Sequence, residues 1–107
     1  MSLDVMLTKI QPTTIYRSNI THNLGDMARV AGLYDYLWHP EDHEITKAAQ
    51  LIQPLREGLE RLRNKPDFFE RFNPKNGWGT YKSFVQFVEL YLKACQEDPD
   101  AAVKVSR

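Results

Sequence analysis

The three histidines are the residues of this chain best suited to acid–base or metal chemistry. His22 stands in Thr-His-Asn, directly before a predicted helix, where an imidazole could act as a general acid or base with a carboxylate such as Asp26. No serine or cysteine nucleophile motif accompanies it. A histidine that only hydrogen-bonds to the backbone near a helix start would give the same pattern. The sequence therefore makes His22 a candidate binding residue and predicts no catalytic residue.

His39 and His43 lie four residues apart, a spacing that places two imidazoles on one face of a helix, as a zinc site requires. Pro40 disfavours a helix through both residues, and no third ligand is obvious. The acidic residues around the pair favour a solvated loop instead. We therefore expect no metal site and no cofactor.

Trp78 lies between Gly77 and Gly79, which allow positive φ on both sides of a large ring. One interpretation is a tight turn that packs Trp78 beneath the next helix, since aromatic side chains more often pack than bind. The other is a ligand-facing loop, in which backbone N–H groups and the helix start at Thr80 would approach an anion. No glycine-rich phosphate-binding motif accompanies the loop.

The composition is that of an ordinary globular protein. Of 107 residues, 42% are hydrophobic and 26% are charged, and the length predicts a single domain, residues 1–107. The formal net charge of +0 argues against specific nucleic-acid binding, which relies on an excess of Lys and Arg. Cys95 is the only cysteine, which excludes an intramolecular disulfide. Because there is no signal peptide and no long apolar run, we expect a cytoplasmic protein without membrane contact.

The helices and strands that would position these residues are predicted to form a mainly α-helical fold with a small two-stranded ribbon. Thr80 is the expected N-cap of the most strongly patterned helix, and Pro54 with Gly58 predicts a bend in another. Strand-forming residues predict that the two terminal segments are extended and pair with each other against the helices. The predicted helices cover residues 23–37, 46–64, 66–72 and 80–97, and the predicted extended segments cover residues 12–21 and 102–106.

Four strings of the sequence together resemble a known family. They are Asn-Ile-Thr-His-Asn-Leu-Gly-Asp-Met-Ala from residue 19, Leu-Trp-His-Pro from residue 37, Phe-Asn-Pro-Lys-Asn-Gly-Trp-Gly-Thr-Tyr from residue 72 and Val-Lys-Val-Ser-Arg from residue 103. As a set they resemble short proteins of bacteria and bacteriophages, over residues 10–107. That family has no assigned activity, so the resemblance implies a phage or mobile-element context and no mechanism. Its pattern often has Arg in place of His39, so it implies no role for that imidazole.

We expect a non-enzymatic binding or interaction module. Its candidate surface combines the polar segment around His22 and Asn23, the glycine-flanked Trp78 and the C-terminal Arg107. All lie at irregular points of the chain, where binding sites are common. These four residues are the hypothesised contacts for an unidentified protein or a small anionic ligand.

Two other functions remain open. One is a binder or hydrolase of a nucleotide-like anion, in which Arg17 and Arg107 would hold the charge and His22 would act as acid or base. The other is a structural subunit of a homo-oligomer.

Overall fold

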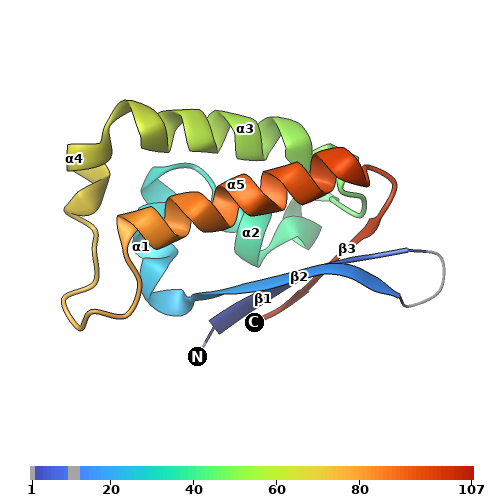
Figure 1. The fold of residues 1–107 in the computed structure, drawn as a ribbon, viewed down its shortest axis with the longest axis horizontal. Helices are drawn as coiled ribbons and strands as arrows, with labels where there is room; N and C mark the ends of the chain where they lie inside the picture. Colours follow the sequence, from blue (N-terminus) through green and yellow to red (C-terminus); the bar gives the residue numbers. More distant parts are fainter. Residues whose placement is uncertain (1, 10–12) are drawn as a thin grey trace.

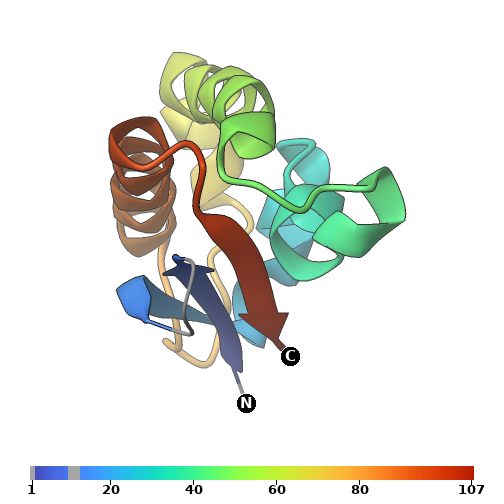
Figure 2. The ribbon, with the colours of Figure 1, turned by 90° about the vertical axis from the view of Figure 1, so that its right-hand side faces the viewer.

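A three-stranded antiparallel sheet forms one side of the molecule (Figures 1 and 2). The computed structural model describes residues 2–9 and 13–107. The strand order is β2-β1-β3, so β1 is the central strand and pairs with both neighbours. The helices lie on one face of this sheet (Figure 2). The strands are β1 (Ser2–Thr8), β2 (Thr14–Thr21) and β3 (Ala102–Ser106).

The prediction of a two-stranded ribbon is wrong, because β1 lies between the two predicted strands and they do not pair with each other. Along β1, Leu3, Val5 and Leu7 are fully buried and alternate with partly exposed residues, as expected for a strand with one face on a core. Met6 obscures this alternation in the sequence, because it is an apolar residue on the outer face. Pro12, in the predicted extended segment, lies outside the described residues; the rest of that prediction and the C-terminal strand agree with β2 and β3.

The helical part consists of two long helices and several short ones. The long helices α3 and α5 pack against each other, and α5 also packs on β2 (Figure 1). The helical elements are η1 (His22–Leu24), α1 (Gly25–Val30), α2 (Tyr34–Trp38), η2 (Pro40–His43), α3 (Ala49–Asn64), α4 (Pro66–Glu70) and α5 (Tyr81–Glu97).

The predicted helix over residues 23–37 is divided into η1, α1 and α2. Gly32 has φ +75° and ends α1, and the Leu33 N–H donates to the Ala28 carbonyl at 2.8 Å, as in a Schellman motif. A glycine in this left-handed conformation stops a helix at little cost. The apolar periodicity continues across the break, which is why the sequence reads as one helix.

Helix α3 begins at Ala49, three residues later than predicted, because the chain directly before it forms an isolated bridge with β3. The Thr46 carbonyl accepts from the Val103 N–H at 2.9 Å, and Lys47 forms a bridge with Ala102. The helix then continues to Asn64 with Pro54 inside it, so Pro54 and Gly58 do not end it, and the bend expected there stays a prediction.

The start of α5 agrees with the prediction. The Thr80 hydroxyl accepts from the Ser83 N–H at 3.0 Å, and the Ser83 hydroxyl accepts from the Thr80 N–H at 2.9 Å. This reciprocal pair is a capping box, so two N–H groups at the start of the helix are satisfied locally.

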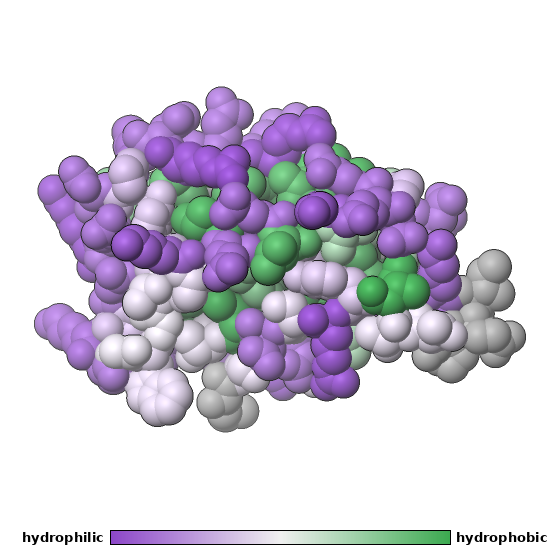
Figure 3. All heavy atoms as spheres, viewed as in Figure 1, coloured by the Kyte–Doolittle hydropathy of each residue, from purple (hydrophilic) through white to green (hydrophobic). Residues whose placement is uncertain are grey.

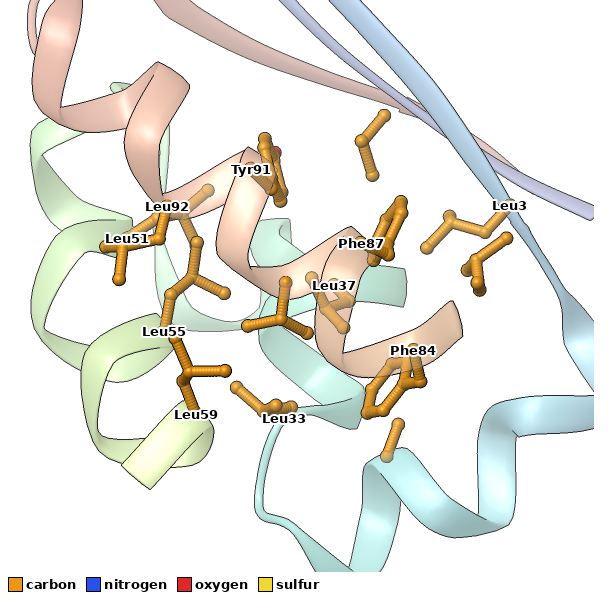
Figure 4. Packing of buried hydrophobic residues seen from close by; sticks show 14 of the residues in the cluster. Leu3, Leu33, Leu37, Leu51, Leu55, Leu59, Phe84, Phe87, Tyr91 and Leu92 are labelled. Atoms are coloured by element: carbon orange, nitrogen blue, oxygen red, sulfur yellow. The ribbon is translucent and has the colours of Figure 1, made fainter. Parts of the chain in front are cut away.

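The core lies between the sheet and the helices. In Figure 4 the side chains of β1, α2, α3 and α5 point into a common interior, with Leu3, Leu37, Leu55 and Phe84 among them. Figure 3 shows that hydrophilic side chains cover most of the outer face seen in Figure 1. Among the residues of known placement, no helix is both long and apolar enough to cross a bilayer.

Because Cys95 is buried, we expect the free energy of unfolding to fall at alkaline pH. Burial raises the pKa of its thiol to about 12, because folding removes the thiolate from water. In the unfolded chain the thiol pKa is about 8.5, so between these values the unfolded state loses its proton first and the free energy of unfolding falls as pH rises. We expect a loss of about 2 kcal/mol between about pH 8 and about pH 10, measured by urea denaturation.

The variant Cys95→Ala is the control for this loss. Burial also raises the pKa of Tyr91, so the variant should keep a smaller decline, beginning near pH 10, where unfolded tyrosine ionises. An equal decline in both proteins between about pH 8 and about pH 10 would show that the thiol is not responsible.

Candidate functional site

Three chain segments meet at one end of the sheet. In the antiparallel register Ser2 lies opposite Thr21, and Asp4 lies opposite Ser106. The start of β1, the end of β2 and the end of β3 are therefore neighbours, as Figures 1 and 2 show. This places His22 and Asn23, directly after β2, and Arg107, directly after β3, at the same end of the sheet.

The glycine-flanked loop packs onto this end. Gly79 has φ +95°, and a Cβ on it would lie 2.7 Å from Thr21 Cγ2 and 2.9 Å from Leu24 Cγ. Only glycine permits so close an approach of the loop to the β2–η1 junction. Gly77 also has a positive φ, +79°, but it faces open space. The convergence of the Trp78 loop with the His22 segment therefore depends on Gly79.

Trp78 itself points outward. Its side chain is 70% exposed, so the interpretation that it packs beneath the next helix is wrong. Leu24 and Phe84, by contrast, are both fully buried members of the core. The Asn76 side-chain oxygen accepts from the Trp78 N–H at 2.9 Å and fixes the turn that carries the ring.

A hollow of about 560 Å³ lies beside this indole. Its walls come from the end of the sheet, from η1 and from the loop, and every lining side chain other than the indole carries a hydroxyl or an amide. None of them is charged. The lining residues are Ser2, Asn19, Thr21, Asn23, Asn76 and Trp78.

His22 is held by a buried tryptophan. The indole N–H of Trp38, which is only 2% exposed, donates to His22 Nδ1 at 2.7 Å. An indole nitrogen can only donate, so Nδ1 is the acceptor and the proton of the neutral imidazole is on Nε2. Nδ1 is therefore occupied by this hydrogen bond and Nε2 carries a proton, so neither nitrogen has a free lone pair with which to act as a general base.

A second hollow, of about 390 Å³, lies next to the first. It is lined by His22 and Asn23 together with Arg29 and Tyr34, and Asn23 lines both hollows. Arg29 is engaged within it: the guanidinium lies 4.0 Å from the centre of the Tyr34 ring and donates to Asp26 at 2.9 Å. Arg29 therefore already contacts a carboxylate and an aromatic ring of the protein.

Arg107 is also committed to intramolecular contacts. Its guanidinium donates to the Trp38 carbonyl at 2.7 Å and to the Glu41 carboxylate at 2.9 Å. The pKa of Glu41 lies below its ordinary value because a backbone hydrogen bond, and then Arg107, favour the carboxylate. Trp38 thus contacts both His22 and Arg107, through its side chain and its carbonyl respectively.

Of the four predicted binding residues, the structure brings His22, Asn23 and Trp78 around two adjoining hollows. Arg107 lies at the same end but lines neither hollow. Sequence reasoning missed Ser2 and Asn19, which the strand register places beside Thr21, and it missed the link through Trp38. The alternation along β2 could have indicated Asn19, because Asn19 and Thr21 share one face.

The other histidines contact their own surroundings. His43 Nε2 lies 3.5 Å from an Asp35 oxygen and its ring stacks on Tyr36, while His39 Nδ1 lies 3.6 Å from Glu41. Within residues 2–9 and 13–107, no three His, Cys, Asp or Glu side chains are gathered in a way that could hold a metal ion.

Because Trp78 is exposed, we expect its removal to have little effect on the stability of the protein. We expect Trp78→Ala to alter the free energy of unfolding by no more than about 0.5 kcal/mol, since surface substitutions rarely do more. Phe84→Ala, which empties a fully buried position, should cost about 3–5 kcal/mol in the same urea titration. A loss of about 2 kcal/mol or more for Trp78→Ala would mean that the ring is packed in solution.

A comparison of the chain with models of protein families, with curated proteins and with solved structures found no match, so the family resemblance seen in the sequence stays a prediction.

Proposed function

We propose that the protein is a non-enzymatic binding module whose contact surface is the end of the sheet around Trp78. The observation that carries this proposal is the outward position of the indole, held beside a polar hollow. Gly79 and Asn76 both shape the loop that presents the ring, and neither adds to the core. A large aromatic surface at a fixed position is a common anchor in binding sites.

The state of His22 supports binding over catalysis. A general base needs an imidazole nitrogen with a free lone pair, and here Nδ1 accepts from Trp38 while Nε2 carries the proton. His22 can still donate a hydrogen bond to a ligand through Nε2. This donor role fits a binding site and argues against the alternative of a hydrolase.

The contacts near the hollows argue against an anion as the ligand. The first N–H groups of α5 already have acceptors: the Tyr81 N–H donates to Asn73 at 2.7 Å and the Ser83 N–H donates to Thr80. The positive end of the helix is therefore largely used within the protein. The Arg107 guanidinium faces Glu41 and Trp38.

The experiment is affinity capture from a bacterial lysate with three versions of the immobilised protein. Wild type is compared with Trp78→Ala and with Leu90→Ala, which removes another exposed apolar side chain (48% exposed) that lines neither hollow. We expect at least one specifically bound species that Leu90→Ala retains and Trp78→Ala loses. A set of bound species unaffected by Trp78→Ala would overturn the proposal. Trp78-dependent recovery of the protein itself would favour the oligomer alternative.

A further inference from the structure

We infer that the hollow beside Trp78 takes a sugar ring, with one face of the ring on the indole and its hydroxyl groups on the surrounding amides and hydroxyls. This inference rests on the proposed function and names the class of ligand. Three properties of the hollow carry it: the exposed aromatic plane, the hydrogen-bonding lining and the lack of charge in that lining.

The aromatic plane provides the apolar part of the site. A pyranose has one face made mainly of C–H groups, and such a face packs favourably on the flat surface of an indole. The Trp78 side chain is 70% exposed, so most of its surface is available to a ligand. The turn fixed by Asn76 and the close packing at Gly79 hold the loop in place before a ligand arrives.

The lining provides the polar part. Asn76 uses its side-chain oxygen for the Trp78 N–H, which leaves its NH₂ group free to donate. The side chains of Ser2, Asn19 and Asn23 add a hydroxyl and two amides to the lining. An amide carries a donor and an acceptor side by side, which matches the donor and acceptor character of neighbouring sugar hydroxyls.

Because its lining carries no charge, the hollow favours a sugar over other ligands that stack on tryptophan. A nucleotide brings phosphates, which need Lys, Arg or free helix N–H groups, and none of these lines the hollow. A flipped nucleobase is held in a closed pocket between apolar side chains, whereas here Trp78 is the one aromatic residue of an open lining. Asp4, opposite Asn19 in the sheet, is paired with Arg17 at 3.9 Å and is not part of the lining.

The affinity that we expect for a sugar follows from the volume of the hollow and from its contact with only one face of the ring. A volume of about 560 Å³ is within the range of about 300–1,000 Å³ typical of ligand pockets. A single sugar ring has few atoms and would be contacted on one face only, so we expect Kd on the order of 1 mM.

The two tryptophans of the chain provide a reporter and a reference for an NMR test of this inference. Their indole N–H groups give separate NMR signals. Trp78 is exposed, while the N–H of Trp38 is buried and bonded to His22. A ligand in the hollow should shift the Trp78 signal and leave the Trp38 signal nearly unchanged.

The experiment titrates the ¹⁵N-labelled protein with glucose, N-acetylglucosamine, cellotriose and chitotriose, each to about 10 mM. We expect a saturable shift of the Trp78 signal with at least one of them. Asn23→Ala should weaken binding about tenfold by removing one amide from the lining, and Leu90→Ala should leave it unchanged. Trp78→Ala removes the reporter, so its loss of binding is followed through the amide signal of Asn19.

Adenosine, ATP and inorganic phosphate are titrated in parallel. No saturable shift with any saccharide, or a tighter response to one of these three probes, would overturn the inference. Capture of a protein partner that depends on Trp78 would then still support the proposed function. If both experiments fail, the surface around Trp78 is not a binding site of either kind.

Discussion

Replacing Gly58 with valine should destabilise the protein by about 3 kcal/mol. Gly58 is buried within α3, and a Cβ on it would lie 2.3 Å from Leu33 Cδ2 and 2.4 Å from Leu33 Cγ. Leu33 is itself fully buried, so its side chain has no free space to move into without displacing its neighbours. The free energy of unfolding, measured by urea denaturation, should fall together with the melting temperature.

The control for Gly58→Val is Glu60→Val, which introduces the same β-branched side chain at an exposed position of the same helix. Its cost should be limited to the helix propensity, about 0.5 kcal/mol. Gly58→Ala should lie between the two, because the gain of about 1 kcal/mol in helix propensity partly offsets the clash. A Gly58→Val protein as stable as wild type would mean that α3 and Leu33 are not in contact in solution.

The same glycine shows why the packing of the fold was only partly predictable. Periodicity predicts α3 and α5 because apolar residues recur every three or four positions, and Thr80 marks the start of α5 by its chemistry. In the sequence, Gly58 together with Pro54 predicts a bend in a helix. In the structure it is a position where the Leu33 side chain packs directly against the helix, in the space that a Cβ would occupy. The identity of the partner, Leu33, depends on tertiary contacts that no local pattern contains.

The central strand was missed for a related reason. The two strands on either side of β1 were expected, but their order was not, since β1 carries Met6 on its outer face and so does not alternate strictly. Strand pairing follows from which segments meet across the whole fold, and the first and last segments of a chain are far apart in sequence. The position of β1 nonetheless decides the site, because Ser2 forms part of the hollow.

For the candidate site, the sequence predicted which residues would lie near one another better than it predicted their contacts. His22, Asn23 and Trp78 do lie around adjoining hollows, as their unusual local sequences suggested. The exposure of Trp78 was not predictable, because a tryptophan between two glycines can turn either into the core or out of it. The acceptor role of His22 depends on Trp38, sixteen residues away, and no spacing rule relates the two.

Trp38 is the position where one substitution should affect both the core and the site. Trp38→Ala should cost about 3–5 kcal/mol, because it removes a ring that is 2% exposed and stacks on Tyr34 with centroids 5.0 Å apart. Trp38→Phe keeps one aromatic ring but loses the N–H donor to His22 and part of the buried ring volume, so it should cost less than Trp38→Ala, about 2 kcal/mol. Both values come from urea denaturation at neutral pH.

The pairing of Trp38 with His22 is tested by a double-mutant cycle. His22→Ala leaves the buried indole N–H without its acceptor and should cost about 1–3 kcal/mol. If the 2.7 Å hydrogen bond accounts for this cost, Trp38→Phe and His22→Ala together should cost less than the sum of the two, by about 1 kcal/mol. Arg107→Ala, which removes a contact to the Trp38 carbonyl, should instead add to Trp38→Phe, because phenylalanine keeps that carbonyl.

The position of the proton on the His22 ring tests the hydrogen bond to Trp38 independently of any stability measurement. In wild type, nitrogen NMR of the imidazole should show the proton on Nε2, because Nδ1 accepts from Trp38. In Trp38→Phe the acceptor is released and both neutral forms of the ring should appear. A proton on Nδ1 in wild type would contradict the hydrogen bond, and with it the argument that His22 has no lone pair for catalysis. The result therefore tests whether His22 has a lone pair available for general-base catalysis.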